Sequence, residues 1–205
     1  MRRVSASLLC AVFVAACVVP ALASVTIKGD MTAANEVAAA FKKLHALPGF
    51  RVRITTTSDK QVTIEFSGPN YHVLQPGGIE MIRVGNTATT RSTAPGAPNG
   101  WKCAAAAPRA IASALGFADP TQTWRQGVGT VQMARGRDTT IERTPAHTIV
   151  ATGESGATGM ETVYVGSQTG LPRRIVLESA GQLTIVDYYD YGASITITLP
   201  QCTAQ

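Results

Sequence analysis

The sequence contains few of the side chains that most often carry chemistry. Its three histidines, His45, His72 and His147, are far apart, and none lies at metal-ligand spacing from another. No Cys-x-x-Cys motif is present, which excludes the common zinc and dithiol redox motifs. We recognise no activated nucleophile and no acid–base pair. We therefore expect a protein that is not an enzyme and that holds no metal or cofactor.

Two short glycine motifs look like functional signatures but depart from them. The segment Gly153-Glu-Ser-Gly-Ala157 lacks the last glycine of Gly-x-Ser-x-Gly and lies in a predicted hairpin region rather than a strand-to-helix turn. The segment Gly127-Val-Gly129 lacks the third glycine and the βαβ setting of a phosphate-binding loop. We interpret both segments as turns.

Aromatic residues and clustered positive charge are also scarce. Aromatic side chains make up 6% of the sequence, and the net charge is +5, to which Arg2 and Arg3 contribute two. No dense run of Lys and Arg is interleaved with aromatic residues. This pattern excludes a typical nucleic-acid-binding surface.

The N-terminus carries the strongest apolar run of the chain. Arg2-Arg3 precede an apolar stretch over about residues 8–19, and Ala21-Leu-Ala23 supplies the small residues that signal peptidases require. We predict a signal peptide over 1–23, cleavage after Ala23, and export to the periplasm. No second stretch is long enough to cross a bilayer.

A second interpretation of the N-terminus remains open. Val14-Ala-Ala-Cys17 resembles a bacterial lipobox, in which Cys17 would become the lipid-anchored first residue. The apolar run before Cys17 is short, so the cleavage after Ala23 is the interpretation we prefer.

The two cysteines beyond the leader are Cys103 and Cys202. In an oxidising compartment, a single pair of cysteines is expected to form a disulfide. Such a bridge would tie the C-terminal tail to the middle of the chain. The alternative is two buried thiols.

Residues 24–205 are enough for one domain with a sizeable core. Asp30 is a helix-capping residue, and apolar residues recur at helical spacing from Ala34 through Val37, Ala38 and Phe41 to Leu44 before Pro48-Gly49. The spacing therefore predicts a helix that begins at about residue 31.

From Phe50 the apolar period changes from helical to two. Short turns separate these segments, which predicts an antiparallel meander up to Arg91. A helical insert is predicted near residues 108–116, and strands resume at about 128. The chain is predicted to end in three strands, the last carrying Ile195, Ile197 and Leu199.

In its predicted sequence of elements, the chain resembles the LolA-like lipoprotein carriers and their LppX-type relatives. The resemblance lies in the order of elements, which close on Val165-Gly-Ser-Gln-Thr-Gly-Leu-Pro-Arg-Arg174 and on Tyr188-Tyr-Asp-Tyr-Gly-Ala-Ser-Ile-Thr-Ile-Thr-Leu-Pro200. It implies an α+β fold, an antiparallel open β half-barrel wrapped around a few short helices. It also implies a periplasmic carrier that holds a lipid or a lipoprotein acyl chain between sheet and helices, with a membrane-anchored donor or acceptor protein as a further partner. We expect a monomer.

Strand alternation predicts which residues form the apolar wall of such a cavity. The wall consists of Val52, Ile54, Val62, Ile64, Phe66, Ile82, Val84, Ile175, Leu177, Leu183, Ile185, Ile195 and Ile197. The same pattern is expected of an ordinary core filled by Phe41, Leu44, Ile111 and Leu115. In that case the fold would serve as an envelope interaction or sensor protein that binds a partner protein. The short, alanine-rich helices favour the cavity, because small side chains fill less volume under a broad sheet.

The tyrosines near the C-terminus suggest no polar site. We predict that Tyr188, Tyr189 and Tyr191 pack at a strand end with their hydroxyls in water.

Overall fold

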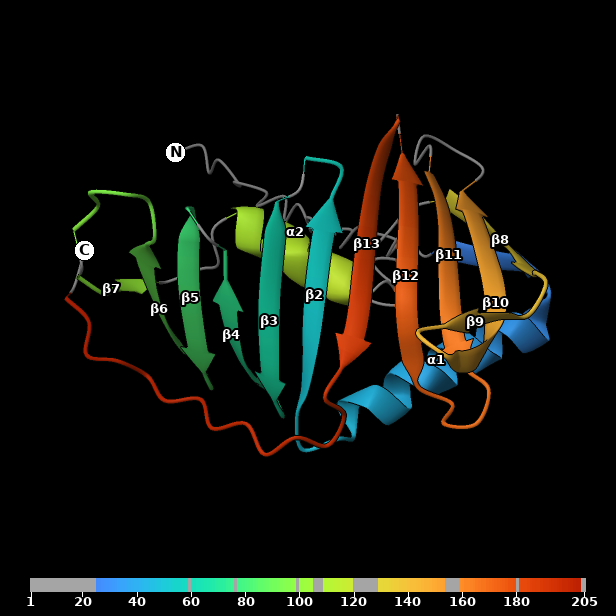
Figure 1. The fold of residues 1–205 in the computed structure, drawn as a ribbon, viewed down its shortest axis with the longest axis horizontal. Helices are drawn as coiled ribbons and strands as arrows, with labels where there is room; N and C mark the ends of the chain where they lie inside the picture. The colour runs from blue at the N-terminus through green and yellow to red at the C-terminus, as the bar shows by residue number, and fades with distance from the viewer. Residues whose placement is uncertain are drawn as a thin grey trace, which may run out of the picture.

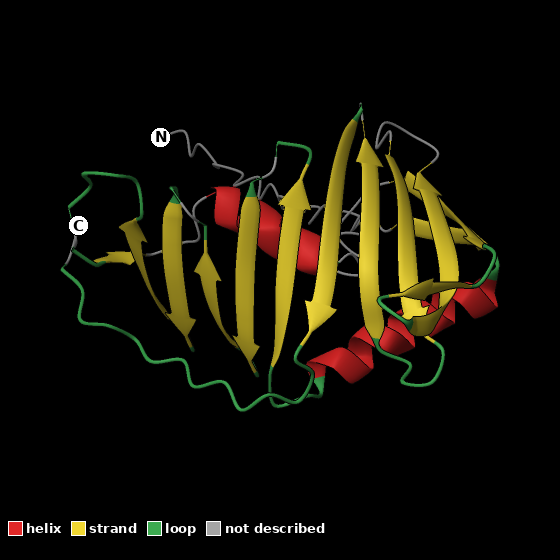
Figure 2. Ribbon diagram, in the orientation of Figure 1, coloured by secondary structure: helices red, strands yellow, loops and turns green. Residues whose placement is uncertain are grey.

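The structure is a computed structural model, and it describes residues 25–58, 60–75, 77–98, 100–104, 109–119, 129–153, 159–179 and 181–203. The predicted signal peptide, the lipobox Cys17 and most of the Gly153–Ala157 segment lie outside these residues. The described strands form one curved, open sheet of thirteen strands, and both helices lie on the same face of it (Figures 1 and 2). The predicted α+β half-barrel over a few short helices is confirmed.

The element bounds follow the predicted order. The helices are α1 (Met31–His45) and α2 (Arg109–Ala118). The strands are β1 (Val25–Gly29), β2 (Phe50–Thr56), β3 (Gln61–Ser67), β4 (Asn70–Leu74), β5 (Ile79–Val84), β6 (Thr87–Ser92), β7 (Lys102–Ala104), β8 (Gly129–Arg135), β9 (Thr139–Ile141), β10 (Thr144–Gly153), β11 (Gly159–Gly166), β12 (Pro172–Ser179) and β13 (Gln182–Tyr189). Their order in the sheet is β1-β8-β10-β11-β12-β13-β2-β3-β4-β5-β6-β7, with β9 paired to β10.

The sheet is antiparallel throughout the predicted meander, in which each strand from β3 to β7 pairs with the one before it. β1 is the exception, because it pairs in parallel with β8, with Ile27 opposite Val131. Sequence reasoning missed β1, which directly follows the predicted leader. A parallel partner distant in sequence leaves no hairpin signal to find.

Helix α1 forms for the predicted reasons. The side chain of Asp30 accepts a hydrogen bond from the backbone N–H of Ala33 at 3.0 Å, which caps the first turn. The buried side chains of α1 are Ala33, Ala34, Val37, Ala40, Phe41 and Leu44. Ala38 was predicted on this face but is exposed, because the apolar stripe passes through Ala40 instead. Among the described residues, neither helix is long and apolar enough to span a membrane.

The predicted disulfide between Cys103 and Cys202 is confirmed, with the two Cα atoms 5.2 Å apart. The prediction of a third C-terminal strand, however, is wrong. Ile195, Ile197 and Leu199 lie in an extended segment that joins no ladder. The reason is that β12 and β2 already occupy both edges of β13, so the chain has no free edge to pair with there.

After β13 the chain instead runs across the ends of the strands, along the lower edge of the sheet in Figure 1, until it reaches β7. We call residues 193–201 the C-terminal strap.

Candidate apolar binding site

The helix-covered face of the sheet carries a broad apolar wall. The strand register aligns Val52, Ile64, Val73 and Met81 in one row across β2, β3, β4 and β5. All four side chains are buried. The wall therefore spans at least four neighbouring strands without a polar interruption.

A second row lies one step further along the strands. It aligns Ile175, Val186, Ile54 and Val62 across β12, β13, β2 and β3. The first three of these side chains are buried, and Val62 is partly buried against the core. The two rows together extend the apolar wall to the half of the sheet that α1 covers.

The lower end of the wall is aromatic. Phe50, Phe66 and Tyr71 are register neighbours on β2, β3 and β4. The rings of Phe50 and Phe66 are stacked with centroids 4.6 Å apart, and Tyr71 follows at 6.4 Å from Phe66. Such offset aromatic contacts add to the stabilisation from burial alone.

The principal contacts of the two helices involve only some of the strands that carry the wall. α1 packs mainly on β1, β8, β11 and β12, and α2 packs mainly on β2. Buried apolar side chains continue past these contacts to Val73 on β4 and Met81 on β5. Among the described residues, the apolar wall is thus wider than the principal footprint of the two helices.

Tyr188 joins the two helices to the sheet. Its hydroxyl donates to the carbonyl oxygen of Ala118 in α2 at 3.0 Å, and its ring meets that of Phe41 in α1 edge-on at 5.8 Å. Burial raises the pKa of Tyr188 well above its usual value. The prediction that this hydroxyl reaches water is therefore wrong. Tyr191 is a second error, since its hydroxyl reaches the carbonyl oxygens of Pro172 and Tyr188.

The structure places seven of the thirteen predicted wall residues on the helix-covered face, and these are Val52, Ile54, Val62, Ile64, Phe66, Ile175 and Leu177. Four others, Ile82, Val84, Leu183 and Ile185, lie on the opposite face. Ile195 and Ile197 belong to the strap.

The four misplaced residues share one cause. β5 and β13 carry apolar residues at both parities, as in Leu183-Thr-Ile-Val186, so alternation alone cannot choose a face. Pairing decides it, because Val186 lies opposite Ile54, whereas Ile185 lies opposite Thr55. The same pairing test places Met81, rather than Ile82, on the helix-covered face.

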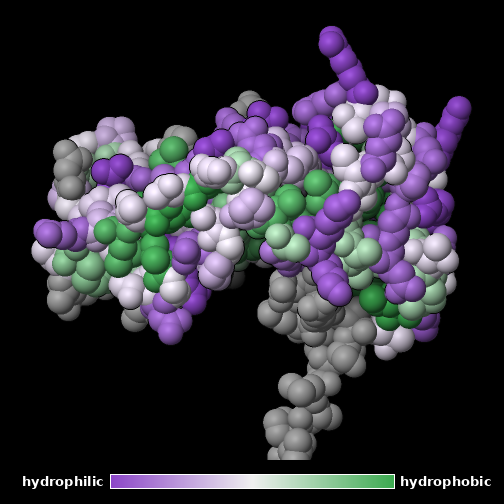
Figure 3. All heavy atoms as spheres, turned by 90° about the horizontal axis from the view of Figure 1, so that it is seen from below, coloured by the Kyte–Doolittle hydropathy of each residue, from purple (hydrophilic) through white to green (hydrophobic). Residues whose placement is uncertain are grey.

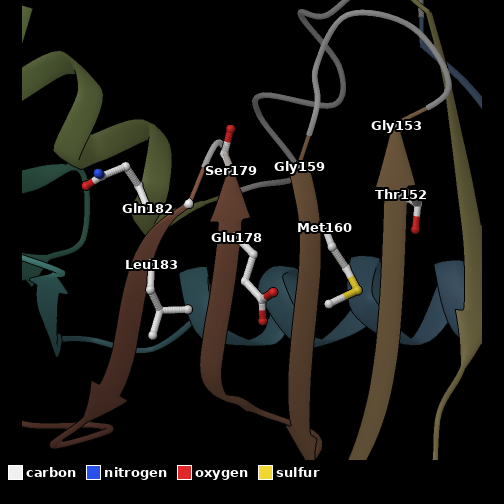
Figure 4. Close-up of a pocket in the computed structure, with 9 residues that line it drawn as sticks. Thr152, Gly153, Gly159, Met160, Glu178, Ser179, Gln182 and Leu183 are labelled. Atoms are coloured by element: carbon white, nitrogen blue, oxygen red, sulfur yellow. The ribbon is translucent and has the colours of Figure 1, made fainter.

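The outer face, opposite the helices, carries its own apolar band. Val176 and Ile185 are register neighbours there, and Met160 and Leu183 flank Glu178 in the next row. Met160 and Leu183 are 41% and 38% exposed. The second row lines a shallow groove of about 470 Å³ at the ends of β10–β13 (Figure 4).

Beyond this band, the outer face also carries a network of charged side chains. His72 bridges two carboxylates, with Glu80 at 2.7 Å and Glu65 at 3.2 Å. Arg51 donates to Glu65 at 2.8 Å, and Arg91 donates to Glu80 at 2.5 Å. Burial raises the pKa of Glu65, but the hydrogen bonds from Arg51 and His72 outweigh it, so the pKa is lowered overall. This network is a sheet-stabilising feature that sequence spacing did not predict.

Neither of the other histidines is isolated. His147 pairs with Glu36 at 2.6 Å, and His45 pairs with Asp119 at 2.8 Å, so each links a helix to another element. Within the described residues, no group of three or more His, Cys, Asp or Glu side chains is arranged to hold a metal ion.

Known proteins resemble this chain in structure rather than in sequence. No protein-family model matches the chain, and no curated protein matches it. Among solved structures, the lipoprotein LppX of Mycobacterium tuberculosis superposes with a TM-score of 0.60 at 11% identity, over 83% of this chain and 100% of that one. The chain has the LppX-type, LolA-like fold.

Two further solved structures are similar to this chain. LprF of Mycobacterium bovis gives a TM-score of 0.52 at 15% identity, over 84% of this chain and 98% of that one. A LolA superfamily protein of Nitrosomonas europaea is more distant, with a TM-score of 0.33 at 15% identity over 78% and 92%. At these identities, the LppX-type likeness establishes the fold alone.

Proposed function

We propose that this protein is a non-enzymatic binding protein of the bacterial envelope that shelters a lipid, a lipoprotein acyl chain or another long apolar ligand between its sheet and its helices. The observation that carries the proposal is the apolar wall, which continues past the main helix contacts to Val73 and Met81. The likeness to LppX, a lipoprotein, supports the envelope location in this proposal. The disulfide between Cys103 and Cys202 fits an extracytoplasmic location.

The affinity of such a site would come from burial. Each CH₂ group removed from water contributes about 0.8 kcal/mol, so ten methylenes contribute roughly 8 kcal/mol before ordering costs are subtracted. No reactive group is needed for this activity. The residues that we propose to line the site are those on the helix-covered face, with Val62, Phe66 and Leu177 among the partly buried ones.

Native mass spectrometry tests this proposal. The full chain is expressed with export to the periplasm, purified without detergent and measured under non-denaturing conditions. We expect a species heavier than the mature polypeptide by the mass of a lipid, which organic extraction removes. A protein that is always bare, and that also fails to bind added fatty acid, would overturn the proposal.

A second candidate function is supported by the outer face. An antiparallel sheet normally presents polar residues on the face opposite its core, whereas here Met160 and Leu183 stand exposed beside a groove. Such a band fits docking of a partner protein. A photoreactive amino acid at position 183 should then give one discrete cross-linked product in the periplasm. The same photoreactive amino acid in place of Thr184, on the helix-covered face, is the control and should give no cross-linked product.

A further inference from the structure

The C-terminal strap crosses the sheet where the aromatic end of the wall lies. In Figure 1 it runs beneath the lower ends of the strands from β2 to β7. Seen from below, apolar surface gathers on the left of the view, over the same edge (Figure 3). The strap thus runs along the strand ends at which Phe50, Phe66 and Tyr71 lie.

The strap is anchored at its first end by close backbone contact with Gly49. The N–H of Gly192, just before the strap, donates to the carbonyl oxygen of Gly49 at 2.8 Å. A Cβ atom added to Gly49 would lie 2.5 Å from the carbonyl oxygen of Ala193, which real structures do not tolerate. Only glycine therefore allows the strap to approach the start of β2 this closely.

The strap is anchored at its second end by the disulfide. Cys202 is bonded to Cys103 in β7, and the neighbouring Thr203 exchanges backbone hydrogen bonds with Cys103 at 2.9 Å and with Trp101 at 3.0 Å. These contacts hold the end of the strap to the last strand of the sheet.

Between the two anchors the strap depends on side chains. Within the described part of the chain, residues 194–201 form no backbone hydrogen bond. Ile195 and Ile197 are half-buried, and Ile195 lies beside Gly49. A segment with few buried contacts and no backbone ladder opens at low free-energy cost once an anchor is released.

We propose that the strap is the gate through which an apolar ligand reaches the wall, and that the Cys103–Cys202 bridge is the clasp that holds this gate shut. The proposal rests on the proposed function, since it names the entrance to the same site. With the bridge intact, the strap opens rarely. With the bridge broken, its C-terminal end is released and the aromatic end of the wall becomes accessible.

The clasp is opened in the test by dithiothreitol. The S–S bond between Cys103 and Cys202 accepts two electrons and two protons and becomes two thiols, while dithiothreitol closes to its cyclic disulfide. Reduction is performed on protein that has already folded, and near-ultraviolet circular dichroism is used to test whether the reduced protein stays folded.

The measurement is the association rate of cis-parinaric acid, a fluorescent fatty acid, by stopped flow. We expect the rate constant to rise by about tenfold or more on reduction, because the open fraction limits entry. Hydrogen exchange of the Cys103 and Thr203 amides, which are hydrogen-bonded at the end of the strap, should accelerate in parallel, whereas exchange in β2 and β3 should not. If the fatty acid binds the oxidised and the reduced protein at the same rate, the proposal that the strap is a gate is wrong, whereas the proposed binding function stands. If it binds neither form, the proposed function itself is wrong.

A second variant keeps the test decisive if the reduced protein unfolds. Gly49→Ala, measured with the disulfide intact, displaces the strap at its first anchor and should also speed entry of cis-parinaric acid. Gly100→Ala is the matched control, because a Cβ there meets no atom within 4 Å. Equal association rates for the two variants would overturn the proposal.

Discussion

The hydroxyl of Tyr188 donates a hydrogen bond to the main-chain carbonyl oxygen of Ala118 across 3.0 Å. Tyr188 belongs to β13 and Ala118 ends α2, so this contact fixes the second helix against the centre of the sheet. The same ring packs on Phe41 of α1. One side chain, only 2% exposed, therefore sets the position of both helices over the apolar wall.

Replacing Tyr188 with Phe should lower the free energy of unfolding by about 1–2 kcal/mol, because the Ala118 carbonyl loses its partner while the packing on Phe41 remains. Urea denaturation measures the change. Tyr189→Phe is the control on the opposite face of β13 and should cost less than about 0.5 kcal/mol. Equal effects would show that the buried hydrogen bond does not position the helices.

The two faces of β12 can be compared at adjacent residues. Leu177 lies on the helix-covered face opposite Thr184, whereas Val176 lies on the outer face opposite Ile185. Leu177→Glu places a second carboxylate beside Glu161 on the helix-covered face and should weaken fatty-acid binding at least about tenfold, since an unpaired charge there is costly. Val176→Glu should leave affinity within about twofold. Fluorescence titration measures both, and melting curves confirm that both variants are folded.

The disulfide should contribute substantially to stability. It closes a loop over a sequence separation of 99 residues. The double variant Cys103→Ser/Cys202→Ser should lower the free energy of unfolding by about 2–5 kcal/mol. Guanidinium denaturation of the oxidised parent and the variant measures the difference. An unchanged midpoint would mean that the bridge does not stabilise the fold.

The Glu65 network predicts a pH dependence. The pKa of Glu65 is lower in the folded protein than its usual value of 4.5, so its ionised form stabilises the fold above that pH. This stabilisation is lost as pH falls through the folded-state pKa. Glu65→Gln should therefore be less stable than the parent at pH 7, by about 1 kcal/mol or less, and the gap should narrow below pH 4.5. Thermal melts at pH 7 and pH 3 measure it, and a gap that widens in acid would contradict the assignment.

Much of the fold could be predicted because local signals agree with it. Asp30 and the apolar stripe through Val37, Phe41 and Leu44 determine α1, and strict alternation from Phe50 determines the meander. The disulfide was predictable because only two cysteines lie beyond the predicted leader. These features depend on residues that are close in sequence or few in number.

The remaining features depend on pairing between distant segments. Ile185 and Val186 are equally apolar, and only the register with β2 shows that Val186 faces the helices. Ile195 and Ile197 alternate like a strand, but no free edge is left for them beside β13. The role of Tyr188 needs the position of Ala118, which no local pattern encodes. Apart from β1, which was missed, and the C-terminal strand, which does not form, such errors concern the faces of strands rather than element types.

Photo-cross-linking with a diazirine-labelled fatty acid tests the central claim most directly. The full protein is incubated with the probe, irradiated and digested, and the modified residues are mapped by mass spectrometry. The account predicts adducts on the helix-covered face, at residues such as Val62, Phe66 and Leu177, and their loss when unlabelled fatty acid competes. Adducts confined to the outer face around Met160, Val176 and Leu183, or adducts that no competitor removes, would contradict it.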